Sequence, residues 1–317
     1  WWDTERLDKF FTELLGSDLS AGSFLTHHEI WLGLKSILFN LQKKHRASSV
    51  AEQHYDMHKE FYADMLDDHM QYTCAYWKNA DSLAEAQTDE MKLLCEKMNL
   101  DEADNAVEFG GGWGYLAHYA AENYDVHVDV YNISEEQVRW ARQHNDHPNV
   151  SYHLEDYREA TGSYDACYSI GFFEAVGPKN YEKHFDLVHD LLADGGIALV
   201  QTIGSNFSVP CTDVWYDKYI FPNGVIPSAK QITEATEDKL IIEDWHNYGP
   251  DYDKTLMAWN DNFQSMWDEW EDTFDQRFKR MWEYYLLSSA AAFRCRRLQN
   301  WDIVLSKGDR DHYTSIR

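Results

Sequence analysis

Three glycines at alternate positions follow a short apolar segment, and their spacing suits a ligand-binding turn. The segment is 105–109, and the glycines after it are Gly110, Gly112 and Gly114. Glycine lets the backbone approach a ligand closely and turn sharply into a helix. Glu108 precedes the glycines, where its carboxylate could reach the ammonium group of a ligand such as S-adenosylmethionine. By itself this pattern predicts a tight turn as readily as a binding loop.

Two further features bear on the kind of ligand. A dinucleotide site of the Rossmann dehydrogenases needs an acid after the second strand, about 20 residues beyond the glycines. Tyr131-Asn132 stands there instead, which argues against NAD. After the third strand comes 155–158, Glu-Asp-Tyr-Arg, in which an acid and a ring could bracket an adenine. The same residues also suit a helix N-terminus, where acids face the positive end of the helix dipole.

A third segment, 70–77, mixes aromatic rings with hydroxyl groups and Cys74. It is too aromatic for a solvent loop and too polar for an ordinary core strand. Both a pocket wall and a half-buried surface strand remain open as interpretations.

Alternating strands and helices must position these residues. Helical spacing is clear at 91–98, 135–144 and 181–192. The predicted strands are 105–109, 126–133, 151–155, 166–170, 198–202, 240–244 and 302–306. This alternation predicts a parallel sheet that is covered by helices on both faces.

The two ends of the chain differ from this pattern. Apolar residues recur at helical spacing in 7–15 and 30–41, so we expect residues 1–87 to form a helical segment and 88–317 the main domain. Aromatic residues three or four apart predict one long helix with a buried stripe, which is favoured over a cofactor site. These residues are Trp267, Trp270, Phe274, Phe278 and Trp282. Because the chain begins with Trp1, we expect N-terminal residues to precede it.

Composition excludes several classes of protein. The 317 residues carry 28 Lys+Arg against 55 Asp+Glu, a formal net charge of −27, which argues against nucleic-acid binding. The hydrophobic content of 44% is ample for a core. No apolar segment approaches the roughly 18–20 residues of a membrane helix. The five cysteines form no CxxC pair, so we expect reduced thiols in a cytoplasm and no metal site.

Taken together, the motifs resemble those of the cyclopropane-fatty-acyl-phospholipid synthase family. These enzymes use S-adenosylmethionine to add a methylene across a lipid double bond. The resemblance runs nearly end to end, through the glycine loop and the segments 54–56, 71–77, 173–181, 202–205, 218–224, 244–247 and 251–253. It implies an α/β fold with a seven-stranded, Rossmann-like class I methyltransferase sheet and an N-terminal helical segment.

The resemblance also implies a mechanism. The alkene attacks the methyl group of the sulfonium, a carbocation forms, and loss of a proton from the new methyl group closes the ring. In the family a bound bicarbonate is the base, and its ligands correspond here to Cys74, Glu174, Gln201, Ile203 and Tyr252. Gln201 replaces a histidine. Its amide can donate a hydrogen bond but cannot carry a charge, so we expect a weaker bicarbonate site. Slower deprotonation could then yield a methyl-branched olefin.

Further site residues follow from the resemblance. Those expected at S-adenosylmethionine are Tyr72, Thr73, Glu108, Gly110, Gly112, Gly114, Asn132, Gln137, Asp156 and Tyr157. Departures from the family pattern are Gly111 for Cys, Ala175 for His, Ser289 for Cys, and a different Val130-Tyr131-Asn132. Two rivals stay open: a methyltransferase for a branched lipid or a small amine, and a lipid-binding protein without catalysis.

The expected partner is an unsaturated phospholipid at the inner membrane face, and a homodimer is a further candidate. The basic clusters 43–46 and 294–297 are candidates for phospholipid head groups. A charge of −27 should be repelled by an anionic bilayer. Because about 1 M salt shortens the screening length to about 3 Å, we expect a salt-adapted host.

Overall fold

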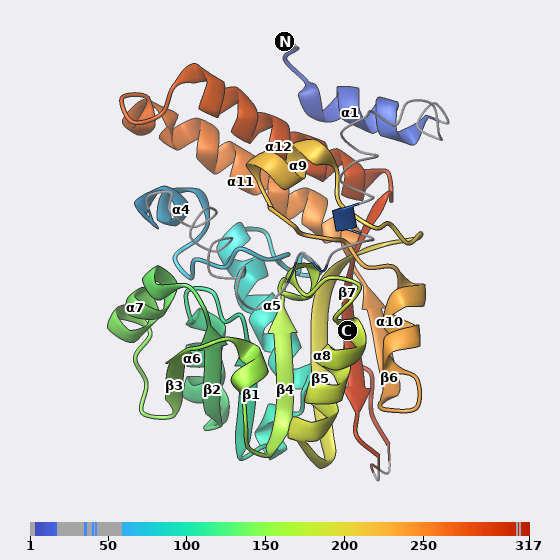
Figure 1. The fold of residues 1–317 in the computed structure, drawn as a ribbon. Coiled ribbons are helices and arrows are strands. Elements are labelled where there is room, and N and C mark those ends of the chain that lie inside the picture. Colours follow the sequence, from blue (N-terminus) through green and yellow to red (C-terminus); the bar gives the residue numbers. More distant parts are fainter. Residues whose placement is uncertain are drawn as a thin grey trace.

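The computed structural model describes residues 4–17, 35, 36, 40, 42, 59–308, 310 and 312–317. Its centre is a seven-stranded sheet in the order β3-β2-β1-β4-β5-β7-β6 (Figure 1). The strands are β1 (Asn105–Phe109), β2 (His127–Asn132), β3 (Val150–Leu154), β4 (Tyr164–Ile170), β5 (Leu192–Ser205), β6 (Ile241–Asn247) and β7 (Leu298–Ser306). All seven predicted strands are therefore present, and the predicted fold class is confirmed.

The sheet is parallel except at β7, which runs antiparallel to both β5 and β6. The alternation of strands and helices predicts a parallel sheet, and this strand is the exception. Its direction follows from the connection. Helices α11 (Gly249–Trp270) and α12 (Gln276–Arg294) form a hairpin that begins directly after β6 and ends directly before β7. The chain therefore re-enters the sheet at the same end from which β6 left it, so β7 runs in the direction opposite to β6.

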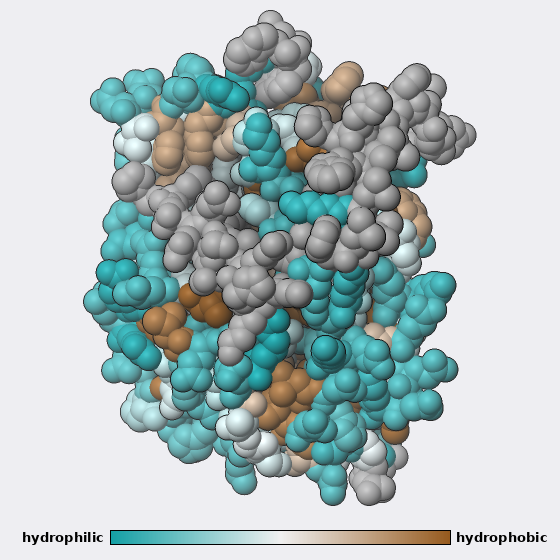
Figure 2. Space-filling model, in the orientation of Figure 1, coloured by the Kyte–Doolittle hydropathy of each residue, from teal (hydrophilic) through white to brown (hydrophobic). Residues whose placement is uncertain are grey.

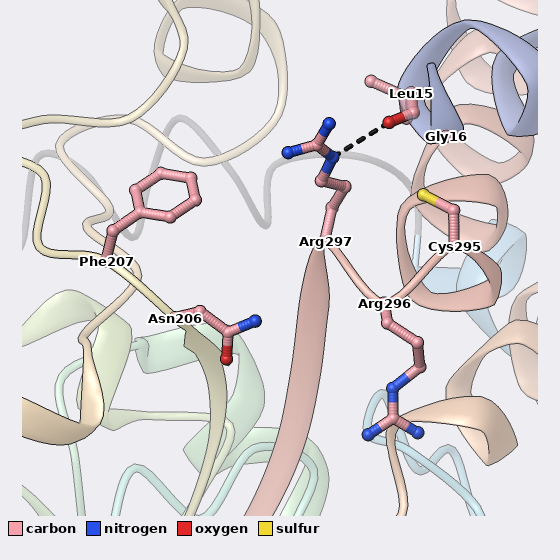
Figure 3. A pocket seen from close by; sticks show the side chains of 7 residues that line it. All are labelled: Leu15, Gly16, Asn206, Phe207, Cys295, Arg296 and Arg297. Carbon is pink, nitrogen blue, oxygen red and sulfur yellow. Dashed lines mark hydrogen bonds between the residues drawn. The ribbon is translucent and has the colours of Figure 1, made fainter. Parts of the chain in front are cut away.

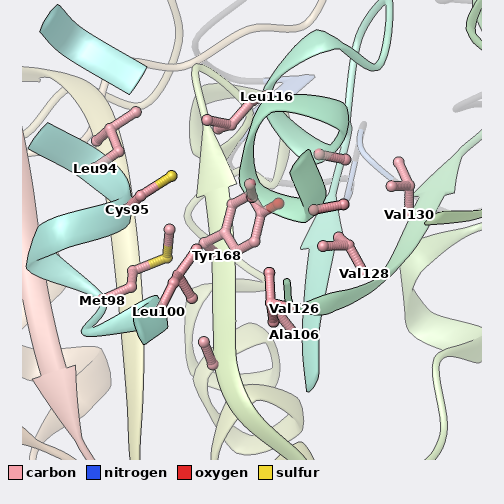
Figure 4. Packing of buried hydrophobic residues seen from close by; sticks show 14 of the residues in the cluster. Leu94, Cys95, Met98, Leu100, Ala106, Leu116, Val126, Val128, Val130 and Tyr168 are labelled. Carbon is pink, nitrogen blue, oxygen red and sulfur yellow. The ribbon is translucent and has the colours of Figure 1, made fainter. Parts of the chain in front are cut away.

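Helices cover both faces of the sheet because its strands are apolar on both sides. On one face lie α5 (Leu83–Lys97), α6 (Tyr115–Tyr124) and α7 (Glu135–His144), and on the other lie α8 (Tyr181–Leu191) and α10 (Ala229–Thr236). Figure 4 shows the first face, where Tyr168 of β4 reaches between Leu94 of α5 and Leu116 of α6. Ser134 begins α7 by accepting a hydrogen bond from the Gln137 amide.

The predicted single aromatic helix is wrong, although the rings are packed together. The stripe is divided between α11 and α12, because the chain turns at 271–275 and Asp275 caps α12 by accepting from the Phe278 amide at 2.8 Å. The two halves meet around Phe61 of α4 (Lys59–Met65). Its ring centroid lies 5.6 Å from those of Trp270 and Phe278. The predicted buried packing role is confirmed for this cluster.

The N-terminal helix α1 (Leu7–Gly16) lies against α12, and the predicted helical spacing of 7–15 is confirmed. Asp8 accepts from Arg294 at 2.9 Å, and Arg294 also pairs with Asp253. Helix α5 crosses the expected domain boundary at residue 87, so the N-terminal segment and the sheet share this helix. The spacing at 30–41 lies outside the described residues, apart from positions 35, 36 and 40.

The face of the molecule shown in Figure 2 is mostly hydrophilic, and its apolar patches are small and separated. Among the helices of the described residues, none has the length and apolar character that crossing a membrane requires.

Candidate active site

The glycine loop joins β1 to α6 and adopts the backbone that its sequence predicts. Gly110, Gly112 and Gly114 all have positive φ, at 76°, 50° and 84°. At Gly110 a Cβ would also lie only 2.4 Å from the ring of Phe172. Any other residue there would be both strained and obstructed.

The end of β2 completes the first half of the site. The Asn132 side-chain nitrogen donates to the Gly112 carbonyl at 3.2 Å and to Gln137 Oε1 at 3.0 Å. Its side-chain oxygen accepts from the Ser134 amide. Asn132 therefore ties the glycine loop to the start of α7. Both Asn132 and Gln137 form part of a cavity wall.

The segment after β3 is compatible with both interpretations of its sequence, an adenine site and a helix N-terminus. Asp156 caps a short 3₁₀ helix, Tyr157–Glu159, and it forms a bidentate pair with Arg158, both distances being 2.7 Å. Asp156 and Tyr157 also line the same cavity as the glycine loop. An acid and a ring are thus held at the place where an adenine was predicted.

Glu108 lies beneath the glycine loop rather than among the residues of the cavity wall. It is buried, it accepts from the Tyr168 hydroxyl at 3.5 Å, and burial raises its pKa to about 8. Gly111 lies directly above it, and a Cβ there would come within 2.3 Å of Val130 Cγ1. A side chain at position 111 would therefore clash with Val130, so the absence of a side chain at Gly111 is matched to the bulk of Val130.

A cavity of about 770 Å³ extends from this loop into an aromatic region. Its far end is formed by α1, α12 and the segment around α9 (Val214–Tyr219), and segment 218–224 of the family resemblance contributes to this lining. Tyr285 lies there, and its hydroxyl is 2.9 Å from that of Tyr72. The Tyr216 hydroxyl bonds Ser288 and Ser289, so the serine that departs from the family pattern orients a ring of the wall.

Glu174 also lines this cavity. Its Oε1 accepts from the Ile203 amide at 2.6 Å, while its Oε2 is buried without a hydrogen-bond partner in the described part of the chain. Burial raises the pKa of this carboxyl group, and the backbone amides of Glu174 and Ile203 oppose that rise. Tyr252 also lines the cavity, with its ring stacked on Phe293 at 4.6 Å between centroids.

Gln201 also belongs to the cavity wall, but its amide nitrogen is engaged behind it. The Nε2 atom lies 2.7 Å from Glu90 Oε1 and 2.7 Å from the Tyr248 hydroxyl. Glu90 is fully buried, and burial raises its pKa well above its ordinary value. Neither Glu90 nor Tyr248 was singled out from the sequence, since nothing local marks a helix residue that reaches a strand.

Cys74 was expected beside Glu174, yet it is not among the residues that line the cavity. It is fully buried in a small cluster with Tyr76, Leu93 and Tyr248, and burial raises the pKa of its thiol. Of the fifteen predicted site residues, Cys74, Glu108 and Gly114 lie behind the wall, and the other twelve line one cavity. The described residues also contain no group of three His, Cys, Asp or Glu side chains that could hold a metal.

Comparison with known proteins now decides the family. Residues 42–303 match the family model of mycolic acid cyclopropane synthetase. The chain belongs to this family. It is 45% identical over 310 residues to the cyclopropane-fatty-acyl-phospholipid synthase of Escherichia coli (strain K12), covering 97% of this chain and 81% of that protein. The family resemblance inferred from the motifs is therefore confirmed.

Two further members of this group are informative. The tuberculostearic acid methyltransferase of Mycobacterium tuberculosis (strain ATCC 25618 / H37Rv) is 32% identical, over 79% of this chain and 64% of its own. A mycolic acid cyclopropane synthase, in a crystal structure with SAH and CTAB, superposes with a TM-score of 0.76 at 26% identity, covering 84% of this chain and 99% of its own. The chain is accordingly an S-adenosylmethionine-dependent methyltransferase, as predicted.

Proposed function

We propose that this protein transfers a methylene group from S-adenosylmethionine to the cis double bond of an unsaturated acyl chain in a phospholipid, forming a cyclopropane ring. One observation carries the proposal: a single cavity of about 770 Å³ joins the glycine loop to an aromatic end, and Glu174 lies in its wall. A cofactor and a lipid chain can thus meet in one enclosed space. The name of the Escherichia coli relative supports the same reaction.

Different residues of the cavity wall would bind the cofactor and stabilise the carbocation. Asn132, Gln137 and Asp156 would hold the polar part of S-adenosylmethionine near the glycine loop. When the alkene attacks the methyl group, the carbon–sulfur bond breaks and a carbocation remains on the acyl chain. Rings such as Tyr252 and Phe293 would stabilise that cation, since a desolvated cation–π contact contributes about 2 kcal/mol. Loss of a proton from the new methyl group then closes the ring.

The residues around Glu174 fit a bicarbonate in part. Among the described residues Glu174 Oε2 is buried without a hydrogen-bond partner, and burial raises the pKa of this carboxyl group, which shifts it toward the form that donates to an anion. The Tyr252 hydroxyl lies in the same wall. Bound bicarbonate would supply the base for proton removal. Cys74 lies behind the wall, and the Ile203 amide already donates to Glu174, so we propose Glu174 and Tyr252 as its main ligands.

The open end of the cavity suits a membrane surface. A second cavity of about 350 Å³ shares Leu15, Phe207 and Arg297 with the large one, and Arg297 Nε donates to the Leu15 carbonyl (Figure 3). Arg296 beside it is exposed. Exposed apolar side chains lie on the surrounding elements: Phe10, Leu14, Phe207, Tyr219 and Phe221. We propose that these apolar side chains enter the bilayer while the arginines face lipid phosphates. Peripheral attachment and a homodimer remain predictions.

The test uses purified protein, S-adenosylmethionine and vesicles of a monounsaturated phospholipid, with and without bicarbonate. We expect fatty acids heavier by one CH2 that show cyclopropane protons in NMR spectra. The same mass with a surviving alkene would favour the branched-lipid reaction, which the position of Gln201 makes the second candidate. No product despite cofactor binding would refute both.

Variants separate surface binding from chemistry. Arg296→Glu should raise the KM for anionic vesicles and leave S-adenosylmethionine binding unchanged. Arg139→Glu, on the exposed side of α7, makes the same change of charge away from the opening. Equal effects of the two variants on the KM would contradict the proposed membrane surface.

A further inference from the structure

A chain of buried hydrogen bonds behind the cavity wall determines which atom of the Gln201 amide faces the cavity. Gln201 lies on β5 opposite Asp302 of β7, and it is 1% exposed. Its amide nitrogen carries two hydrogens. The structure gives that nitrogen two acceptors, Glu90 Oε1 and the Tyr248 oxygen, both at 2.7 Å.

The direction of this chain is determined by charge. The Tyr248 hydroxyl has one hydrogen, and it donates that hydrogen to Asp302 Oδ1 at 2.9 Å. The Tyr248 oxygen can therefore only accept from Gln201. Burial raises the pKa of Asp302, and the Lys97 ammonium group 3.6 Å away opposes that rise and favours the ionised, accepting form.

The network is balanced around Lys97. Its Nζ lies 3.1 Å from Asp244, and Asp244 also pairs with Arg317 at the C-terminal end of the chain. Two cations thus face two carboxylates, Asp244 and Asp302. Glu90, two helical turns before Lys97 on α5, is left as the uncharged acid of the group, because a third buried anion would be uncompensated.

We infer that Glu90, Tyr248 and Lys97 are positioning residues that hold Gln201 with its carbonyl oxygen toward the substrate cavity. Both amide hydrogens are used behind the wall, so only the oxygen remains to face the reacting groups. This orientation of Gln201 adds to the proposed function, and its effect on the reaction depends on that function. A carbonyl oxygen favours a carbocation and gives no hydrogen bond to an anion. The expectation that Gln201 donates to bicarbonate is thereby replaced.

The first test measures the orientation without catalysis. Side-chain ¹⁵N labelling of glutamine allows hydrogen exchange of each NH2 group to be followed by NMR, with Gln201→Met identifying the signals. Both Gln201 protons should exchange far more slowly than those of Gln143, which is exposed on α7. Tyr248→Phe should speed the exchange of one proton, whereas Glu90→Gln, which keeps an acceptor oxygen, should leave both slow. Exchange of Gln201 as fast as that of Gln143 would overturn the inference.

The second test measures the consequence. For Gln201→Met, the bicarbonate concentration that gives half-maximal cyclopropane formation should not rise, because no donor to the anion is lost. A rise of about tenfold or more, the effect of losing one hydrogen bond, would contradict the proposed orientation. If the wild-type protein forms no product, the proposed function fails, and the exchange measurement still decides the orientation of Gln201.

Discussion

Gly111→Ala tests whether Gly111 and Val130 form one unit beneath the cofactor loop. The position has no positive φ, so an alanine causes no backbone strain there, and the effect is one of packing alone. The new Cβ would lie 2.3 Å from Val130 Cγ1 and 3.0 Å from Glu108 Oε2. Carbon atoms prefer about 3.5 Å, so the loop must move by roughly 1 Å.

A shift of that size has measurable consequences. Overpacking costs typically about 1–3 kcal/mol of unfolding free energy, and a displacement of 1 Å at a binding loop can cost about 10²-fold in activity. We therefore expect Gly111→Ala to weaken S-adenosylmethionine binding in titration calorimetry and to lower the midpoint of thermal unfolding. Val130→Ala in the same chain removes the obstructing methyl group and should restore most of the affinity. Unchanged binding in Gly111→Ala, or no recovery in the double variant, would show that Gly111 and Val130 do not form one packing unit.

Three further predictions concern charge. Lys97→Met removes the ammonium group beside the buried Asp302 and should lower the free energy of unfolding by about 3–5 kcal/mol in urea titrations, and Asp302→Asn in the same chain should recover much of the loss. Burial raises the pKa of Glu108 from 4.5 to about 8, so the free protein should lose stability as pH rises through that interval, by about 1.4 kcal/mol per unit. Glu108→Gln should lack this contribution, so its stability should fall less steeply with pH, and an equal slope in both proteins would contradict the assignment. Activity on anionic vesicles should rise as salt approaches about 1 M, because the charge of −27 is then screened, and a steady fall from low salt would exclude this.

Much of the cofactor half was predictable because its signals are local. The glycines predict the positive φ angles of the loop, and the pattern of apolar residues predicts all seven strands. The break at 271–275 also has a local signal, because Asp275 is a typical capping residue and stands directly before α12. The regular aromatic spacing on either side of the break obscured this signal. The family resemblance added Glu174 and Tyr252, which no spacing argument from the sequence would have brought together.

The amino-acid sequence was sufficient to predict which residues turn, cap and alternate, because those properties depend on φ angles and on neighbours a few positions away. It also determined the net charge and, through its motifs, the family. Only the tertiary structure decided what each site residue contacts. It placed Cys74 behind the cavity wall, turned β7 antiparallel, and set Glu90 and Lys97 of one helix behind Gln201 of a strand. Such contacts join residues about a hundred positions apart, and their energies depend on burial and charge balance that exist only once the chain has folded.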